Sequence, residues 1–166
     1  MSDGTDGDRA EHANVARVRA AAAALGLAID VRRFPEGTRT AQDAATAIGC
    51  PVGAIVKSLI FTVDGEVVLA LVSGANQLDE AKLAAAAGGS TCRRASADEV
   101  RAATGFPIGG VPPIGLATPV REFLDDDLLA HDSVWAAAGT WHDVFPIAPG
   151  DLAAASGGWV GDLRRS

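Results

Sequence analysis

The stretch Gly53-Ala54-Ile55-Val56-Lys57-Ser58-Leu59-Ile60-Phe61 decides the fold, and it holds one charged side chain in an apolar run. Its β-branched and aromatic residues predict a strand over 55–63. Asp64-Gly65 is a hairpin signal, and the apolar run after it predicts a strand over 66–72. Because an unpaired buried charge is costly, Lys57 must reach water, a carboxylate or an anionic ligand. The residues alone leave two readings open: a lysine that extends to solvent, or one that contacts an anion or carbonyl or acts as a base.

Helices and strands alternate along the rest of the chain without a repeat. Apolar spacing predicts a helix over 8–25, and hydroxyl caps at Thr40 and Ser96 predict helices that end near 49 and 104. Further helices are predicted over 78–87 and from 149. Strands are predicted over 28–34, 91–94, 114–120, 133–138 and 144–147. Because hairpins and helices are interleaved, we expect a mixed sheet with helices around it.

Size and composition indicate one domain. The chain has 166 residues, of which 48% are hydrophobic. Residues 1–8 are acidic and polar and are expected to form a disordered tail, with a single domain over 9–166. No apolar run reaches the roughly 18 residues of a membrane helix, and no secretory signal pattern opens the chain. We therefore expect a cytoplasmic protein.

The charge and the metal-binding residue types exclude several function classes. A net charge of −7 argues against a broad basic surface for DNA or RNA, but it allows contact with the end of a nucleic acid. Two cysteines outside any CxxC and three scattered histidines predict no zinc site and no cofactor. The run Asp125-Asp126-Asp127 is interpreted as a solvated turn rather than a metal site.

A glycine-proline loop follows further along the chain, Thr104-Gly105-Phe106-Pro107-Ile108-Gly109-Gly110-Val111-Pro112-Pro113-Ile114-Gly115. Its glycines permit close backbone approach and its prolines stiffen the backbone. Such a loop suits recognition of a polar ligand or stabilisation of an oxyanion, although a structural turn has the same composition. It has neither the P-loop nor the dinucleotide-binding pattern.

The segment Ala138-Gly139-Thr140-Trp141-His142-Asp143 combines a glycine turn with a hydroxyl, a histidine and a carboxylate. His142 is therefore a candidate to bind substrate or to transfer a proton, and an exposed loop histidine is the alternative.

Taken in order, these residues resemble the YbaK/EbsC family of aminoacyl-tRNA deacylases, the prolyl-tRNA synthetase-associated editing domain. The resemblance implies a compact α/β fold, of α+β type, around a mixed and strongly curved sheet surrounded by helices. It also implies hydrolysis of the ester that joins a wrong amino acid to the terminal adenosine of a tRNA. The segments that carry it are 40–45, 56–59, 73–83, 104–106, 110–115 and 138–140.

The resemblance also implies a set of site residues. Lys57 and Gly110 are expected to be catalytic, the lysine by contact with the tRNA end or the substrate and the glycine loop through backbone groups that hold the ester. It implies no metal, and its implied partners are the acceptor end of a mischarged tRNA and an aminoacyl-tRNA synthetase, with no DNA and no membrane. The expected substrate-binding residues are Phe34, Thr40, Ser58, Val111, Pro112, Pro113, Ile114, Gly115, Gly139, Thr140 and His142.

The closing segment bears on the substrate. Trp141-His142-Asp143 differs from the glycine-rich, acidic loop of relatives that act on cysteinyl-tRNA and is closer to relatives that clear alanine. We expect a trans-acting enzyme that removes alanine or another small amino acid from tRNA(Pro), with water as the nucleophile and a ribose hydroxyl aiding proton transfer. Leu116 stands where many relatives have a polar residue. The alternatives are a non-catalytic module that binds the tRNA end or an aminoacyl ligand, and a hydrolase of other acyl esters.

Overall fold

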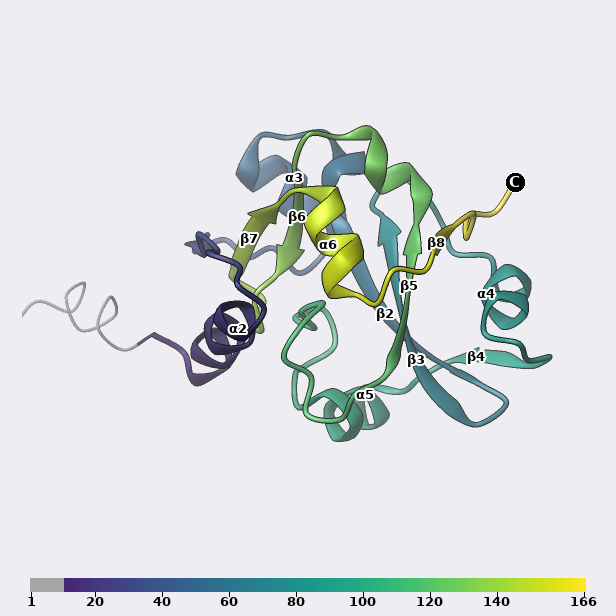
Figure 1. Ribbon diagram of the computed structural model, residues 1–166. Coiled ribbons are helices and arrows are strands. Elements are labelled where there is room, and N and C mark those ends of the chain that lie inside the picture. The colour runs from purple at the N-terminus through teal and green to yellow at the C-terminus, as the bar shows by residue number, and fades with distance from the viewer. Residues whose placement is uncertain (1–10) are drawn as a thin grey trace, which may run out of the picture.

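The computed structural model describes residues 11–166, so the predicted tail over 1–8 lies outside the described residues. The chain forms two sheets with helices around them (Figure 1), which confirms the predicted mixed α/β fold. The five-stranded sheet has the order β4-β2-β3-β5-β8, and the three-stranded sheet has the order β1-β7-β6. Pairing is parallel for β3–β5 and β5–β8 and antiparallel elsewhere. The strands are β1 (Arg32–Arg33), β2 (Val56–Val63), β3 (Glu66–Ser73), β4 (Cys92–Arg94), β5 (Arg121–Asp125), β6 (Val134–Ala137), β7 (Asp143–Ile147) and β8 (Val160–Gly161).

The β2–β3 hairpin forms as predicted and sets the register of the larger sheet. Asp64 and Gly65 make the two-residue turn with φ angles of 50° and 86°, the left-handed conformation that such turns require. The register pairs Val63 with Glu66 and Val56 with Ser73. Apolar side chains cover both faces of this hairpin, and each face belongs to a separate core cluster.

Over residues 11–166 five helices surround the sheets, and two of them begin at the predicted hydroxyl caps. The Thr40 hydroxyl accepts a hydrogen bond from the backbone N–H of Asp43, and Ser96 and Glu99 form a reciprocal capping box. In Figure 1, α2 lies beside the smaller sheet and α4 lies next to β4, on the other side of the molecule. None of the helices over residues 11–166 is long and apolar enough to span a membrane. The helices are α2 (Ala13–Ala24), α3 (Ala41–Ile48), α4 (Glu80–Ala86), α5 (Ala97–Thr104) and α6 (Pro149–Ala155), with short 3-10 turns over Val52–Ala54 and Asp126–Ala130.

The strand predicted over 114–120 is wrong, because that segment is bound to the end of α5 instead of to a neighbouring strand. The backbone N–H groups of Ala117 and Thr118 donate to the carbonyl oxygens of Thr104 and Ala103. The strand in this part of the chain, β5, begins only at Arg121. A strand of five residues that includes Arg121, Glu122 and Asp125 does not carry the apolar pattern on which the prediction depended.

Candidate functional site

A cavity of about 400 Å³ lies where the two sheets meet, between β2 and the strands β6 and β7. Ile55 and Trp135 form an isolated bridge there, which joins the larger sheet to the smaller one. The N-terminal end of α3, α5 and the segment 108–111 complete the walls. The lining residues are Thr38, Arg39, Thr40, Ala41, Ala44, Ile55, Val56, Lys57, Ser58, Leu59, Ile60, Arg94, Ala95, Val100, Ile108, Gly109, Val111, Trp135, Ala137 and Val144.

The middle of β2 is an open sheet edge, and the cavity lies along it. β4 pairs only with residues 61–63 of β2, and beyond it the N–H of Ala95 donates to the carbonyl oxygen of Ile60 at 3.0 Å. In an antiparallel ladder, backbone groups alternate between the two edges, so those of Ser58 point to the same edge as those of Ile60. Ser58 lines the cavity, and we infer from the strand geometry that its main-chain N–H and carbonyl point toward it. Side chains alternate along a strand, so that of Ser58 lies on one face of β2 and those of Lys57 and Leu59 lie on the other.

Lys57 is half-buried in this wall, and its ammonium group donates a hydrogen bond to the carbonyl oxygen of Asn76. Burial lowers the pKa of Lys57 and the positive charge of Arg94 lowers it further, while the carboxylate of Asp125 raises it. Among residues 11–166, no carboxylate lies within ion-pair distance of Lys57.

Two arginines that line the same cavity, Arg39 and Arg94, likewise have no ion-pair partner in the described part of the chain. This contrasts with Arg33, Lys82 and Arg121, each of which is paired with a carboxylate. Among residues 11–166 of a chain whose net charge is −7, three cations around one cavity thus have no carboxylate partner. Such a site favours an anionic ligand.

Asp125 is fully buried and organises the loop that holds Lys57. Its carboxylate accepts hydrogen bonds from the backbone N–H of Ser73 at 3.1 Å and from the side-chain amide of Asn76 at 2.8 Å. The same amide reaches Asp127 at 2.8 Å. The prediction of a solvated turn over Asp125–Asp127 is therefore wrong for Asp125. Within residues 11–166 these three carboxylates are the one acidic or histidine cluster with metal-like spacing, and their oxygens accept from Asn76, Ser73, the Asp127 N–H and Arg164.

The two hydroxyl side chains predicted in the site differ in their surroundings. Thr40 lines the cavity with its hydroxyl engaged as the cap of α3. The Ser58 hydroxyl is buried and has no hydrogen-bond partner among the described residues. No histidine or carboxylate of residues 11–166 therefore accepts a hydrogen bond from it, as a base that takes its proton would.

The glycine-proline loop reaches the cavity only in part. Ile108, Gly109 and Val111 line it, whereas Gly110 and the segment 112–115 do not. The Gly110 N–H donates to the carbonyl oxygen of Pro107 at 2.9 Å, so it is not free to stabilise an oxyanion as expected. A Cβ at Gly110 would lie 3.2 Å from backbone atoms of Gly139 and Thr140, so this glycine permits the close approach of the two segments. Pro112, Pro113 and Ile114 are buried, and Gly115 adjoins Ala21 of α2.

The segment 138–143 lines a second cavity, of about 290 Å³. Gly139, Thr140 and His142 lie there and not in the first cavity, so the predicted site residues that line a cavity are divided between the two cavities. Phe34 lines neither cavity: its backbone N–H donates to the His142 carbonyl at 2.8 Å, and its own carbonyl lies 3.2 Å from His142 Nδ1. The second cavity is lined by His12, Asn14, Arg33, Arg101, Pro107, Gly139, Thr140, Trp141 and His142.

Sequence reasoning missed Arg39, Arg94 and Trp135 as lining residues. The uneven placement of the arginines was visible in the sequence, but only the fold shows which of them remain unpaired around a cavity. Trp135 carried no signal, because its place depends on how β6 meets β2.

Comparisons with known proteins show the family of this chain. Residues 35–155 match the family model of the aminoacyl-tRNA editing domain. A proline–tRNA ligase of Nitratidesulfovibrio vulgaris (strain Hildenborough) is 36% identical over 129 residues, which cover 77% of this chain and 21% of the ligase. The chain thus spans about a fifth of the length of the ligases that it matches. The uncharacterized protein YwhH of Bacillus subtilis is 32% identical over 74% of this chain and 78% of its own length. A solved structure described as a candidate trans-editing enzyme for prolyl tRNA synthetase is 44% identical, with a TM-score of 0.88, and the match covers 94% of this chain and 99% of that one.

Proposed function

Because the chain belongs to the aminoacyl-tRNA editing domain family, we propose that it hydrolyses the ester bond of a mischarged tRNA in trans. The proposed substrate is alanine or another small amino acid on tRNA(Pro), and the proposed compartment is the cytoplasm, where translation takes place. The resemblance to a candidate trans-editing enzyme and to proline–tRNA ligases supports both the reaction and the tRNA.

The observation that carries this proposal is the cavity with Lys57 in its wall and Arg39 and Arg94 beside it. All three cations lack carboxylate partners among the described residues. A tRNA end brings phosphates and a polarised ester into such a site, and cations without partners are available to bind them. The largely aliphatic remainder of the wall leaves room for a small apolar side chain.

The proposed chemistry is the attack of water on the carbonyl carbon of the aminoacyl ester. The bond between that carbon and the ribose oxygen breaks, the ribose oxygen takes up a proton, and the products are a free amino acid and a tRNA with a free ribose hydroxyl. We assign Lys57 to hold the substrate end by charge. The main-chain N–H of Ser58, on the open edge of β2, is the donor proposed to stabilise the developing oxyanion.

An acyl-enzyme route through Ser58 receives no support from the geometry, because its hydroxyl has no general base beside it among the described residues. Water positioned in the cavity, with a ribose hydroxyl of the substrate to relay the proton, requires no such base.

The alternative is a module that binds the tRNA end without cleaving it. Leu116, the sequence feature that favoured this alternative, packs against the main core cluster and does not line either cavity. The position of Leu116 therefore gives no support to this alternative.

A panel of misacylated tRNAs tests the proposal. Alanyl-tRNA(Pro) and cysteinyl-tRNA(Pro) are the leading members, correctly charged prolyl-tRNA(Pro) is the reference, and alanyl-adenosine is the fragment without RNA. Release of one wrong amino acid well above the reference supports an editing enzyme. A panel with no release from any member, with the protein folded, contradicts it, and equal cleavage of fragment and tRNA favours a general acyl-ester hydrolase.

A further inference from the structure

The second cavity has an unusual charge for this chain. Its lining residues include Arg33, Arg101, His12 and His142 and no acidic residue, although the sequence has 21 acidic residues against 14 lysines and arginines. Arg101 lies in the last turn of α5, exposed, with no carboxylate at ion-pair distance in the part of the chain that the structure describes. Arg33 is bound through one nitrogen to Asp143 at 2.8 Å, and its side chain stays 60% exposed, which leaves other donors for a ligand.

An aromatic ring adjoins these cations. The Trp141 indole N–H donates to the carbonyl oxygen of Ile108 at 2.8 Å, which fixes a ring that is nevertheless 38% exposed. The Arg39 guanidinium lies over this ring at 4.1 Å from its centre. A fixed, exposed aromatic ring among cations is the arrangement that single-stranded RNA binders use to stack bases and to hold phosphates.

The two cavities share a wall. Arg39 lines the first cavity and Trp141 the second, so their stacked pair separates them. The segment Pro107–Gly109 continues the wall, with Pro107 in the second cavity and Ile108 and Gly109 in the first. A chain that passes from one cavity to the other therefore crosses Arg39, where a phosphodiester would meet a guanidinium.

We propose that this second cavity binds the nucleotide that precedes the terminal adenosine of the RNA substrate, with its base against the Trp141 indole and its phosphate bound by Arg101. This inference rests on the proposed function and assigns a binding site to the part of the RNA that precedes the aminoacyl-adenosine. Arg33 contributes a second donor to the same phosphate.

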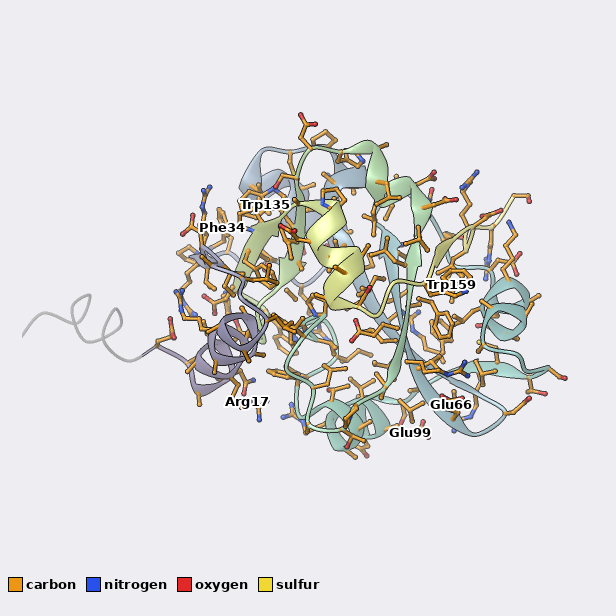
Figure 2. The ribbon with its side chains drawn as sticks, viewed as in Figure 1. Arg17, Phe34, Glu66, Glu99, Trp135 and Trp159 are labelled. Atoms are coloured by element: carbon orange, nitrogen blue, oxygen red, sulfur yellow. The ribbon has the colours of Figure 1, made fainter. Side chains whose placement is uncertain are left out.

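The three tryptophans of the chain provide a site-specific test by NMR, with the full chain and no aminoacyl group. Trp135 lines the first cavity and Trp141 the second. Trp159 packs edge-on against Phe123 and lies on the opposite side of the molecule from Trp135 (Figure 2), so it serves as the internal control. The indole N–H resonances, assigned with Trp141→Phe, are followed during titration with the ribonucleotide trimer CCA, with adenosine 5′-phosphate and with inorganic phosphate.

The trimer is expected to shift the resonances of Trp135 and Trp141 and to leave that of Trp159 in place. Adenosine 5′-phosphate is expected to shift Trp135 alone. Arg101→Ala should weaken trimer binding about tenfold. It should also reduce the slope of log affinity against log salt concentration by the amount that corresponds to about one phosphate contact. The matched control Arg121→Ala removes an exposed arginine that is paired with Glu66 and lines neither cavity, and this variant should bind the trimer as the parent does.

Three results would overturn the inference: a trimer that does not shift Trp141, an Arg101→Ala variant that binds the trimer as tightly as the parent, or an equal Trp141 shift with inorganic phosphate alone. The panel of misacylated tRNAs separates this failure from that of the proposed function. If the protein cleaves members of the panel but fails the NMR test, only the proposed second site is contradicted. If it binds the trimer at Trp141 without cleaving any tRNA, only the proposed reaction is contradicted.

Discussion

Asn76 joins Lys57 to Asp125. Its carbonyl oxygen accepts a hydrogen bond from the Lys57 ammonium group, and its side-chain amide donates to the buried Asp125 carboxylate at 2.8 Å. Asp125 also accepts from the N–H of Ser73, where β3 ends and the loop to Asn76 begins. The position and the proton affinity of Lys57 therefore depend on a residue of β5 that does not line the cavity.

Asp125→Asn should change the pH dependence of deacylation. The Asp125 carboxylate raises the pKa of Lys57 against the effect of burial, so its removal lowers that pKa. Because the proposed role needs protonated Lys57, the fall of kcat/KM on the alkaline side should begin at lower pH in the variant, as measured in rate profiles from about pH 6 to 10. Asp126→Asn is the control, because Asp126 bonds only to Arg164 among these groups. If kcat/KM falls over the same alkaline pH range in the parent and in Asp125→Asn, the Asp125 carboxylate does not act on Lys57.

Glu122→Gln should remove a dependence of stability on pH. Burial raises the pKa of Glu122 from 4.5 to about 8, and its Oε1 atom has no hydrogen-bond partner among the described residues. Between these values the folded protein binds a proton that the unfolded chain releases, so this group's contribution to the free energy of unfolding falls as pH rises from 4.5 to about 8 and is constant above. Each unit of pKa shift corresponds to about 1.4 kcal/mol.

The difference between parent and Glu122→Gln isolates this group from the other titrating side chains. Urea denaturation at intervals across that pH range should show that the free energy of unfolding of the variant, relative to that of the parent, rises by a few kcal/mol between the acid end and the alkaline end. A difference that stays constant with pH would mean that Glu122 is ionised in the folded protein.

Gly139→Ala should loosen the contact between α2 and the segment 138–143. Gly139 has a φ of +101°, and a Cβ there would lie 2.8 Å from the Cβ of Asn14 and 3.1 Å from the ring of Phe106. The strained backbone and the clash should lower the free energy of unfolding by about 1–3 kcal/mol. Gly150→Ala is the matched control: its Cβ meets open space in α6, and it should raise the stability by about 0.5–1 kcal/mol. Equal effects of the two substitutions would be inconsistent with this packing.

Local signals in the sequence predicted most of the elements, since caps and turns act over a few residues. Asp64-Gly65, Thr40 and Ser96 each form the turn or cap that their residue types predict. Strand β5 was missed because its stability comes from parallel pairing with β3 and not from its own pattern.

The site was predictable only as far as single residues carry a signal. Lys57 was recognisable because a charge in an apolar strand needs an explanation. The link from Asp125 through Asn76 and the stacking of Arg39 on Trp141 join segments far apart in the sequence, so neither was visible before the chain was folded.

The most direct test of the account is the rate at which alanine is released from alanyl-tRNA(Pro) by the parent, by Lys57→Ala and by Lys82→Ala. Lys82 is the only other lysine in the sequence, and its ammonium group is paired with Asp162 outside the cavity. The account predicts that Lys57→Ala lowers kcat/KM by about 100-fold or more while it stays folded, and that Lys82→Ala retains the rate of the parent. A Lys57→Ala protein as active as the parent on this tRNA and on the rest of the panel would contradict it.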